Sequence, residues 1–254
     1  MSKYCIECRN ELSDEAKFCT SCGKQQVEQM KQVIKEYIAT PQESTGPAAL
    51  DLKATYNLLI ETKNKIYDLV QDAEKLIKED KNVDVFTKQI VNKMESDLKT
   101  AYDIAKKVKS IDPNVIIKDP STNEIITCDH VISLSCNLMG SIGYNFVLYQ
   151  GRSSIDANKR ILRRAQTNFI ESNTIMPTAF AQYNIALAMD LQTEGTIRIG
   201  EFILDINGNR IFLTPLNSKK AKRTVYDAYQ RVIDLYPESD QAVEARKRQT
   251  EIKI

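Results

Sequence analysis

Apolar residues recur at alternating steps of three and four along residues 52–77, and again along residues 90–108. This spacing puts them on one face of a helix, so both segments are predicted to be amphipathic helices. The apolar positions are Leu52, Tyr56, Leu59, Ile66, Val70, Ala73 and Ile77 in the first segment, and Ile90, Met94, Leu98, Ala101, Ala105 and Val108 in the second. Residues 79–82 break the pattern, and Asp84 is the predicted N-cap of the second helix. Because a short turn joins two helices of similar length, we expect an antiparallel helical hairpin.

Two short β signals interrupt the helical pattern. Residues 115–117 and 124–127 flank a polar turn, while residues 202–206 and 209–213 flank Asn207-Gly208, which favours a two-residue hairpin turn. In both segments an aspartate enters the turn and an Asn-x-Ile sequence leaves it. Since a lone hairpin is marginally stable in water, we expect the two hairpins to pair with each other or to lie against the helices.

One long stretch, residues 131–151, carries no charged side chain. It contains five serine and asparagine side chains, so it is interpreted as a buried core helix and not as a membrane span. A stripe of small residues runs along it, formed by Ser133, Cys136, Gly140 and Gly143. Such a stripe would let another helix approach closely.

Four cysteines stand near the N-terminus in two pairs, each with two residues between its members: Cys5, Cys8, Cys19 and Cys22. This spacing lets one tight turn aim both sulfurs of a pair at the same ion, which predicts a site for one structural zinc. Four thiolates leave no open position for water, so a catalytic zinc is not expected. Disulfides and iron are the alternatives; a reducing compartment disfavours disulfides, and iron accepts the same tetrahedral donor set.

The residues around these cysteines, 4–8 and 16–24, resemble the short N-terminal zinc ribbons of many bacterial and archaeal proteins. The resemblance implies that the two cysteine pairs share one zinc ion. Arg9 stands where the first pair is usually followed by glycine, whereas Gly23 follows the second pair. A short amphipathic helix, with Val27 and Ile38 at its ends, and a polar linker over residues 40–47 are predicted next.

The C-terminal third resembles a tetratricopeptide repeat in fragments. Residues 181–188 are similar to the first helix of such a repeat, and Val225, Tyr229, Val232, Leu235 and Pro237 have the spacing of a second helix and its closing proline. The predicted fold is mainly α: a zinc ribbon over residues 1–25, a short helix and flexible linker over 26–47, a long antiparallel helical hairpin over 48–112, and a tetratricopeptide-repeat-like helical region with one or two small β-hairpins over 113–254.

Cys128, His130 and Cys136 suggest a second metal site only weakly. There are three candidate ligands, and on a helix His130 points well away from the two cysteines. The favoured interpretation is that the cysteines pack as small buried apolar residues.

Composition is ordinary for a globular protein: 42% of residues are hydrophobic, and 35 basic side chains oppose 34 acidic ones. No global field therefore favours nucleic acid or an anionic membrane. Two local groups of cations stand out, which we call the first basic cluster (Arg152, Lys159, Arg160, Arg163 and Arg164) and the second basic cluster (Lys219, Lys220, Lys222 and Arg223).

The sequence contains one histidine and no phosphate-binding glycine loop or nucleophile motif, so we do not expect an enzyme. No secretory segment opens the sequence, which favours the cytoplasm. The favoured function is a protein-interaction scaffold with the ribbon as a tethered recognition module and a protein as partner. The alternative is a nucleic-acid-associated protein that uses the ribbon and both basic clusters.

Overall fold

The computed structural model describes residues 3–4, 11–12, 43–83, 85–149, 155–194, 202–212 and 218–252. The chain divides into two compact units, Met1–Ser44 and Thr45–Ile254. In the described part of the first unit, strand β1 (Lys3–Tyr4) pairs antiparallel with β2 (Glu11–Leu12). The helix predicted between Val27 and Ile38 lies outside the described residues.

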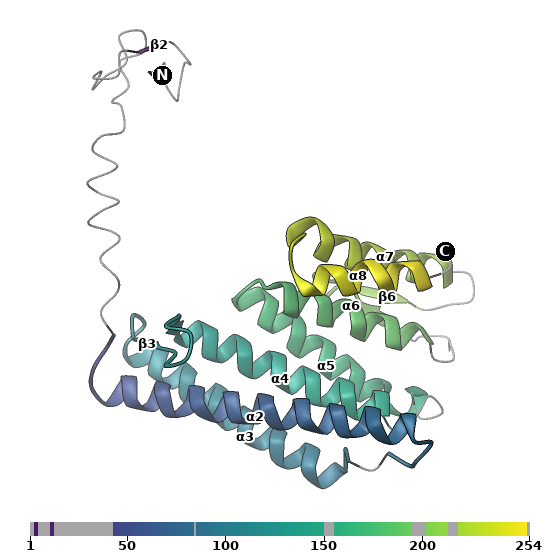
Figure 1. Ribbon diagram of the computed structural model, residues 1–254, viewed down its shortest axis with the longest axis horizontal. Coiled ribbons are helices and arrows are strands. Elements are labelled where there is room, and N and C mark those ends of the chain that lie inside the picture. Colours follow the sequence, from purple (N-terminus) through teal and green to yellow (C-terminus); the bar gives the residue numbers. More distant parts are fainter. Residues whose placement is uncertain are drawn as a thin grey trace. The chain divides into compact units, whose positions relative to one another are not determined.

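The second unit is mainly helical, as predicted, with seven helices in its described part (Figure 1). Its elements, in chain order, are α2 (Pro47–Lys78), α3 (Lys88–Ile111), β3 (Ile116–Lys118), β4 (Ile125–Thr127), α4 (Cys128–Tyr149), α5 (Ile155–Ile175), α6 (Ala179–Glu194), β5 (Phe202–Leu204), β6 (Arg210–Phe212), α7 (Ser218–Leu235) and α8 (Asp240–Glu251).

Helices α2 and α3 form the predicted antiparallel hairpin, with Pro47 near Ile111 at one end and Asp72 near Ile90 at the other. The predicted apolar stripes are largely buried, but Ile77 is 55% exposed and Ile90 is 37% exposed. The start of the hairpin also differs from the prediction, because Pro47 belongs to α2 and not to the linker. Its fixed φ suits the first helical turn, where its missing N–H costs nothing.

The N-cap of α3 is Thr87, not Asp84 as the sequence suggested. The Thr87 hydroxyl accepts a hydrogen bond from the Ile90 backbone N–H at 3.3 Å, which satisfies one of the free donors at the helix start. Asp84 itself lies outside the described residues. The turn between the helices packs on the end of α4, where the Phe86 and Tyr149 rings stack with centroids 5.5 Å apart.

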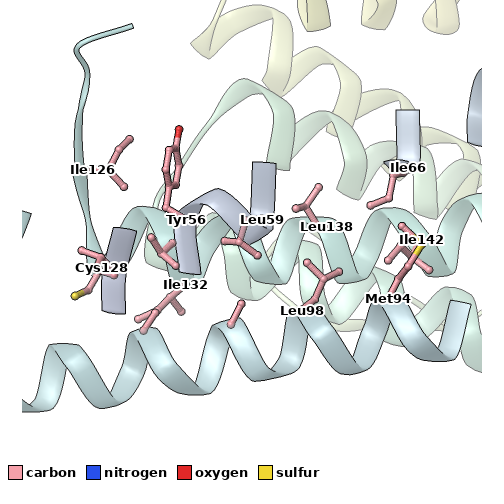
Figure 2. Packing of buried hydrophobic residues seen from close by; sticks show 14 of the residues in the cluster. Tyr56, Leu59, Ile66, Met94, Leu98, Ile126, Cys128, Ile132, Leu138 and Ile142 are labelled. Atoms are coloured by element: carbon pink, nitrogen blue, oxygen red, sulfur yellow. The ribbon is translucent and has the colours of Figure 1, made fainter. Parts of the chain in front are cut away.

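The helices of the second unit contact one another in a regular pattern along the chain. Each packs against its neighbour in the chain, and in addition α2 contacts α4, α4 contacts α6, and α6 contacts α8. Figure 1 shows them stacked in sequence order, from α2 and α3 to α7 and α8. Figure 2 shows the first core, in which Leu59 of α2, Leu98 of α3 and Leu138 of α4 meet. A second core, built around Phe169, Met189 and Tyr229, joins α5 to α6 and α7.

Helix α4 lies at the centre of this packing, against α3 on one side and α5 on another. It is the one helix in the described part of the chain that is long and apolar enough to cross a membrane, and 67% of its apolar window is buried inside the protein. This burial agrees with the prediction of a core helix. The stripe of small residues does admit a close neighbour, since a Cβ on Gly140 would lie 2.9 Å from the Ala165 carbonyl oxygen of α5.

Both predicted β-hairpins are present, as two separate two-stranded sheets. They pack against helices and not against each other: β3–β4 lies on α2 and α4, and β5 lies on α5 and α6. The second turn differs from the prediction. Asp205 pairs with Asn209, so the loop has three residues and not two, and Gly208 takes the left-handed conformation with φ 82° that a three-residue loop needs.

Candidate metal centre and surface sites

The predicted zinc ligands, Cys5, Cys8, Cys19 and Cys22, lie outside the described residues. The short strands that are described bracket the first pair, because β1 ends at Tyr4 and β2 begins at Glu11.

The donor set fits zinc. Four thiolates complete a tetrahedron around Zn²⁺, and such a closed site contributes folding energy instead of activating water. When bound, the ion holds together a segment too short to bury its own apolar core. The four cysteines would therefore act as structural ligands.

Cys128, His130 and Cys136 do not form a second metal site. Both cysteines are buried, and the described residues include no group of three His, Cys, Asp or Glu side chains placed to hold an ion. His130 instead serves the start of α4: its Nδ1 accepts from the Thr127 backbone N–H at 3.3 Å, and the Thr127 hydroxyl accepts from the His130 N–H at 3.3 Å. The interpretation of the two cysteines as small buried residues is therefore confirmed.

Burial shifts the titration of the two cysteines away from metal binding. It raises the pKa of the Cys128 thiol, and it raises the pKa of Cys136 to about 12. It also lowers the pKa of His130. Because thiolates are the metal ligands and the charged form is disfavoured in an apolar interior, both cysteines stay as thiols at neutral pH.

The described residues of the first basic cluster lie on the first half of α5. Lys159 is only 5% exposed, the Arg163 guanidinium lies 4.6 Å from the centre of the Phe202 ring, and Arg164 forms an ion pair with Glu95 of α3. Arg160 is exposed, and Arg152 lies outside the described residues. Three of the five cations are thus buried or engaged within the protein.

The second basic cluster occupies the first turns of α7. Arg223 pairs with Asp227 at 3.0 Å, and Lys222 lines a hollow of about 370 Å³ that also holds Asp190, Arg248 and Glu251. Carboxylates therefore accompany these cations, which weakens their combined field.

A polar groove between α3 and α5 was not predicted from the sequence. Two adjoining hollows, of about 430 and 340 Å³, share Tyr102 and Glu171. The Tyr102 hydroxyl donates to Glu171 at 2.7 Å, and the Lys106 ammonium donates to the same hydroxyl at 3.2 Å. The Glu171 hydrogen bond raises the pKa of Tyr102. Lys109 and Asp129 close one end as an ion pair at 2.7 Å.

An apolar groove of about 380 Å³ runs between α2 and α3, and we call it the α2–α3 groove. Leu58, Leu69, Ile90 and Met94 form its apolar part, and Lys65, Asp68, Asp72, Lys93 and Asp97 form its rim. Ile90 was predicted to lie in the apolar stripe of α3, but it is 37% exposed and lines this groove. A second hollow, of about 330 Å³, lies toward the other end of the same helix pair, beside Ile104 and Ile111.

Comparison with known proteins identifies the N-terminal segment. Residues 4–26 match the zinc-ribbon domain family, and this match contains all four predicted zinc ligands. Searches of the curated proteins and of the solved structures found no match to the chain. The N-terminal segment is thus a zinc-ribbon domain, and its family implies zinc binding.

Proposed function

We propose that this protein is a cytoplasmic, zinc-binding interaction scaffold without catalytic activity. In this proposal the helical unit presents a groove to a protein partner, and the zinc ribbon is a second recognition module. The observation that carries the proposal is the α2–α3 groove, an open surface hollow whose floor is apolar.

The alternating helix contacts support a repeat-like scaffold. Neighbouring helices pair, and α2, α4, α6 and α8 contact one another in turn, as expected when successive helix pairs stack. The fragments similar to a tetratricopeptide repeat fall on this pattern. Helix α7 ends at Leu235 just before Pro237, and Ser239 caps α8 by accepting from the Ala242 N–H at 3.1 Å. We therefore propose α6 and α7 as one such pair and α8 as the start of another.

The nucleic-acid alternative receives less support. A phosphate-binding surface needs several cations that converge and remain free to displace counterions. Here Arg164 and Arg223 are paired with carboxylates, and Lys159 is buried. The arrangement thus favours a protein partner over DNA or RNA.

Affinity purification of the tagged full chain, with and without nuclease, separates the two functions. For the scaffold we expect a reproducible set of co-purifying proteins that nuclease leaves unchanged. Replacing Arg160, Arg163 and Arg164 by alanine should leave that set unchanged too, with Lys247→Ala on α8 as a control for loss of surface charge. Submicromolar binding to an RNA or DNA oligonucleotide at physiological salt, abolished by the triple substitution, would instead establish the alternative.

A further inference from the structure

The α2–α3 groove has an apolar floor, so a ligand can fill it without forming hydrogen bonds there. Leu58 and Leu69 are partly buried, Met94 is 8% exposed and Ile90 is 37% exposed. Thr62, also in the lining, already donates its hydroxyl to the Leu58 carbonyl oxygen at 2.8 Å. A ligand that fills the groove therefore gains from burying apolar area and needs no buried polar group of its own.

The shape of the groove favours a helix. Its described lining comes from two antiparallel helices, and on α2 it extends from Leu58 to Asp72, which corresponds to ~21 Å of helix. No strand edge is present in this lining to pair with an extended peptide. A third helix laid along two antiparallel ones packs its side-chain ridges into the groove between them, and α4 already contacts both helices of this pair.

The rim of the groove is acidic on its α2 side. Lys93 and Asp97 of α3 neutralise each other at 3.3 Å, whereas Asp68 and Asp72 form no hydrogen bond or ion pair within the described part of the chain. These two carboxylates are four residues apart and thus lie one helical turn from each other on the same face. Lys65 is the one other charged residue that α2 contributes to this lining in the described part of the chain, so one negative charge remains uncompensated.

We propose that the α2–α3 groove binds an amphipathic helix of a partner protein, whose apolar stripe covers Ile90 and Leu69 and whose flank carries lysine or arginine at two positions one turn apart, opposite Asp68 and Asp72. This inference deepens the proposed scaffold function and rests on it. The apolar floor supplies most of the affinity, and the two carboxylates set which helices bind and in which direction they lie.

The test uses the zinc-loaded full chain and a displayed library of helical peptides of about 18 residues, with a fixed apolar stripe and randomised flanks. We expect the selected peptides to carry two cations one turn apart. Their affinity, measured by fluorescence anisotropy, should fall about tenfold in Ile90→Ser and about tenfold in Asp68→Asn/Asp72→Asn. Only the carboxylate variant should also weaken the dependence of binding on salt.

Two variants on α8 or just before it serve as matched controls because they change the same kinds of side chain elsewhere. Val243→Ser removes another apolar side chain, 56% exposed, and Glu238→Gln/Glu244→Gln removes another two exposed carboxylates. Both should bind the selected peptides as the parent chain does. Selection of flanks without cations, or equal binding by the groove variants, would overturn the proposal.

Light scattering on the same samples tests a second copy of the chain as the occupant. A dimer of the parent chain that Ile90→Ser converts to a monomer would also overturn the partner-helix proposal. The affinity purification described above tests the scaffold function separately. If both groove variants still co-purify the same proteins, the scaffold function is supported but the groove is not its binding site. If no protein co-purifies with the parent chain, the scaffold function itself is contradicted.

Discussion

Two glycines on α4, Gly140 and Gly143, leave different amounts of room for a side chain. A Cβ on Gly140 would lie 2.5 Å from the Phe169 ring and 2.9 Å from the Ala165 carbonyl oxygen, whereas one on Gly143 would lie 3.4 Å from its nearest neighbours. We predict that Gly140→Ala forces α4 and α5 apart and lowers the free energy of unfolding by about 1–3 kcal/mol. Gly143→Ala should be neutral or stabilise the helix by up to about 1 kcal/mol.

Urea denaturation followed by circular dichroism measures both effects. The two substitutions add the same methyl group to the same helix, so each controls for the other. Equal stability of the two variants would contradict the close approach of α4 and α5 at Gly140.

Asp119 organises the turn of the β3–β4 hairpin and ties it to α2. One of its oxygens accepts from the Ser121 N–H, the Ser121 hydroxyl and the Thr122 N–H, and the other accepts from the Tyr56 hydroxyl at 2.6 Å. The hydrogen bonds from Ser121 and then Tyr56 hold the pKa of Asp119 well below its usual range. The carboxylate therefore stabilises the fold above its unfolded pKa of about 4, and this stabilisation is lost as the pH falls through its lower folded value.

We predict that Tyr56→Phe lowers the free energy of unfolding at pH 7 by about 1–2 kcal/mol, because it leaves an Asp119 oxygen without its donor. Asp119→Asn should lower the urea midpoint at pH 7, and its difference from the parent chain should shrink as the pH falls below about 4. Urea titrations at pH 7, 5 and 3 measure this. A difference that stays constant with pH would mean that the carboxylate charge contributes nothing.

At the scale of elements, the turn of the β5–β6 hairpin depends on Asp205 and Gly208. The Asp205 carboxylate accepts from the backbone N–H groups of Asn207 at 2.9 Å and Asn209 at 2.8 Å, and Gly208 has φ 82°. We predict a loss of about 1 kcal/mol for Asp205→Ala and a loss of about 1 kcal/mol for Gly208→Ala. Amide hydrogen exchange of residues 202–212 would show the effect as faster exchange in this hairpin, while the β3–β4 hairpin serves as the internal control.

Helical periodicity was enough to predict α2 and α3, because each buries one continuous stripe and a polar turn separates them. Local sequence likewise predicted the two hairpins and the close approach of another helix to the small residues on α4. Local sequence did not distinguish Thr87 from Asp84 as the cap of α3, since both are good N-cap residues and tertiary packing sets where the helix starts. Nor did it give the three-residue turn, because Asn-Gly is a strong signal for the shorter loop and the Asp205 hydrogen bonds outweigh it here.

The surface sites were beyond sequence reasoning for a different reason. The hydrogen bond from Tyr102 to Glu171 and the ion pair of Arg164 with Glu95 each join residues 69 positions apart. Periodicity says which face of α3 and α5 is buried but not how the two helices align along their length. The α2–α3 groove likewise depends on which side of the helix pair α4 covers, and that choice is made by packing across the whole unit.

At the scale of the whole molecule, the zinc ribbon and the helical unit should respond separately to metal. The purified chain is expected to contain one zinc, held by Cys5, Cys8, Cys19 and Cys22. Metal analysis of protein purified without chelator measures this stoichiometry. The variant His130→Ala should still contain one zinc, since His130 is engaged with Thr127 at the start of α4.

Removal of zinc should unfold the ribbon and spare the helices. The ribbon is too short to bury a core, so its folding free energy is largely metal-binding free energy. The unit Thr45–Ile254 has its own apolar cores, built from residues such as Leu59, Leu98 and Tyr229. We therefore predict that Cys5→Ser/Cys8→Ser abolishes zinc binding but shifts the main thermal transition by no more than about 2 °C and leaves the helical circular dichroism nearly unchanged. Cys128→Ser, which places a polar hydroxyl in the first core, should lower that transition and leave the zinc content at one per chain. A large loss of helicity in the double variant would show that the stability of the helices depends on the metal.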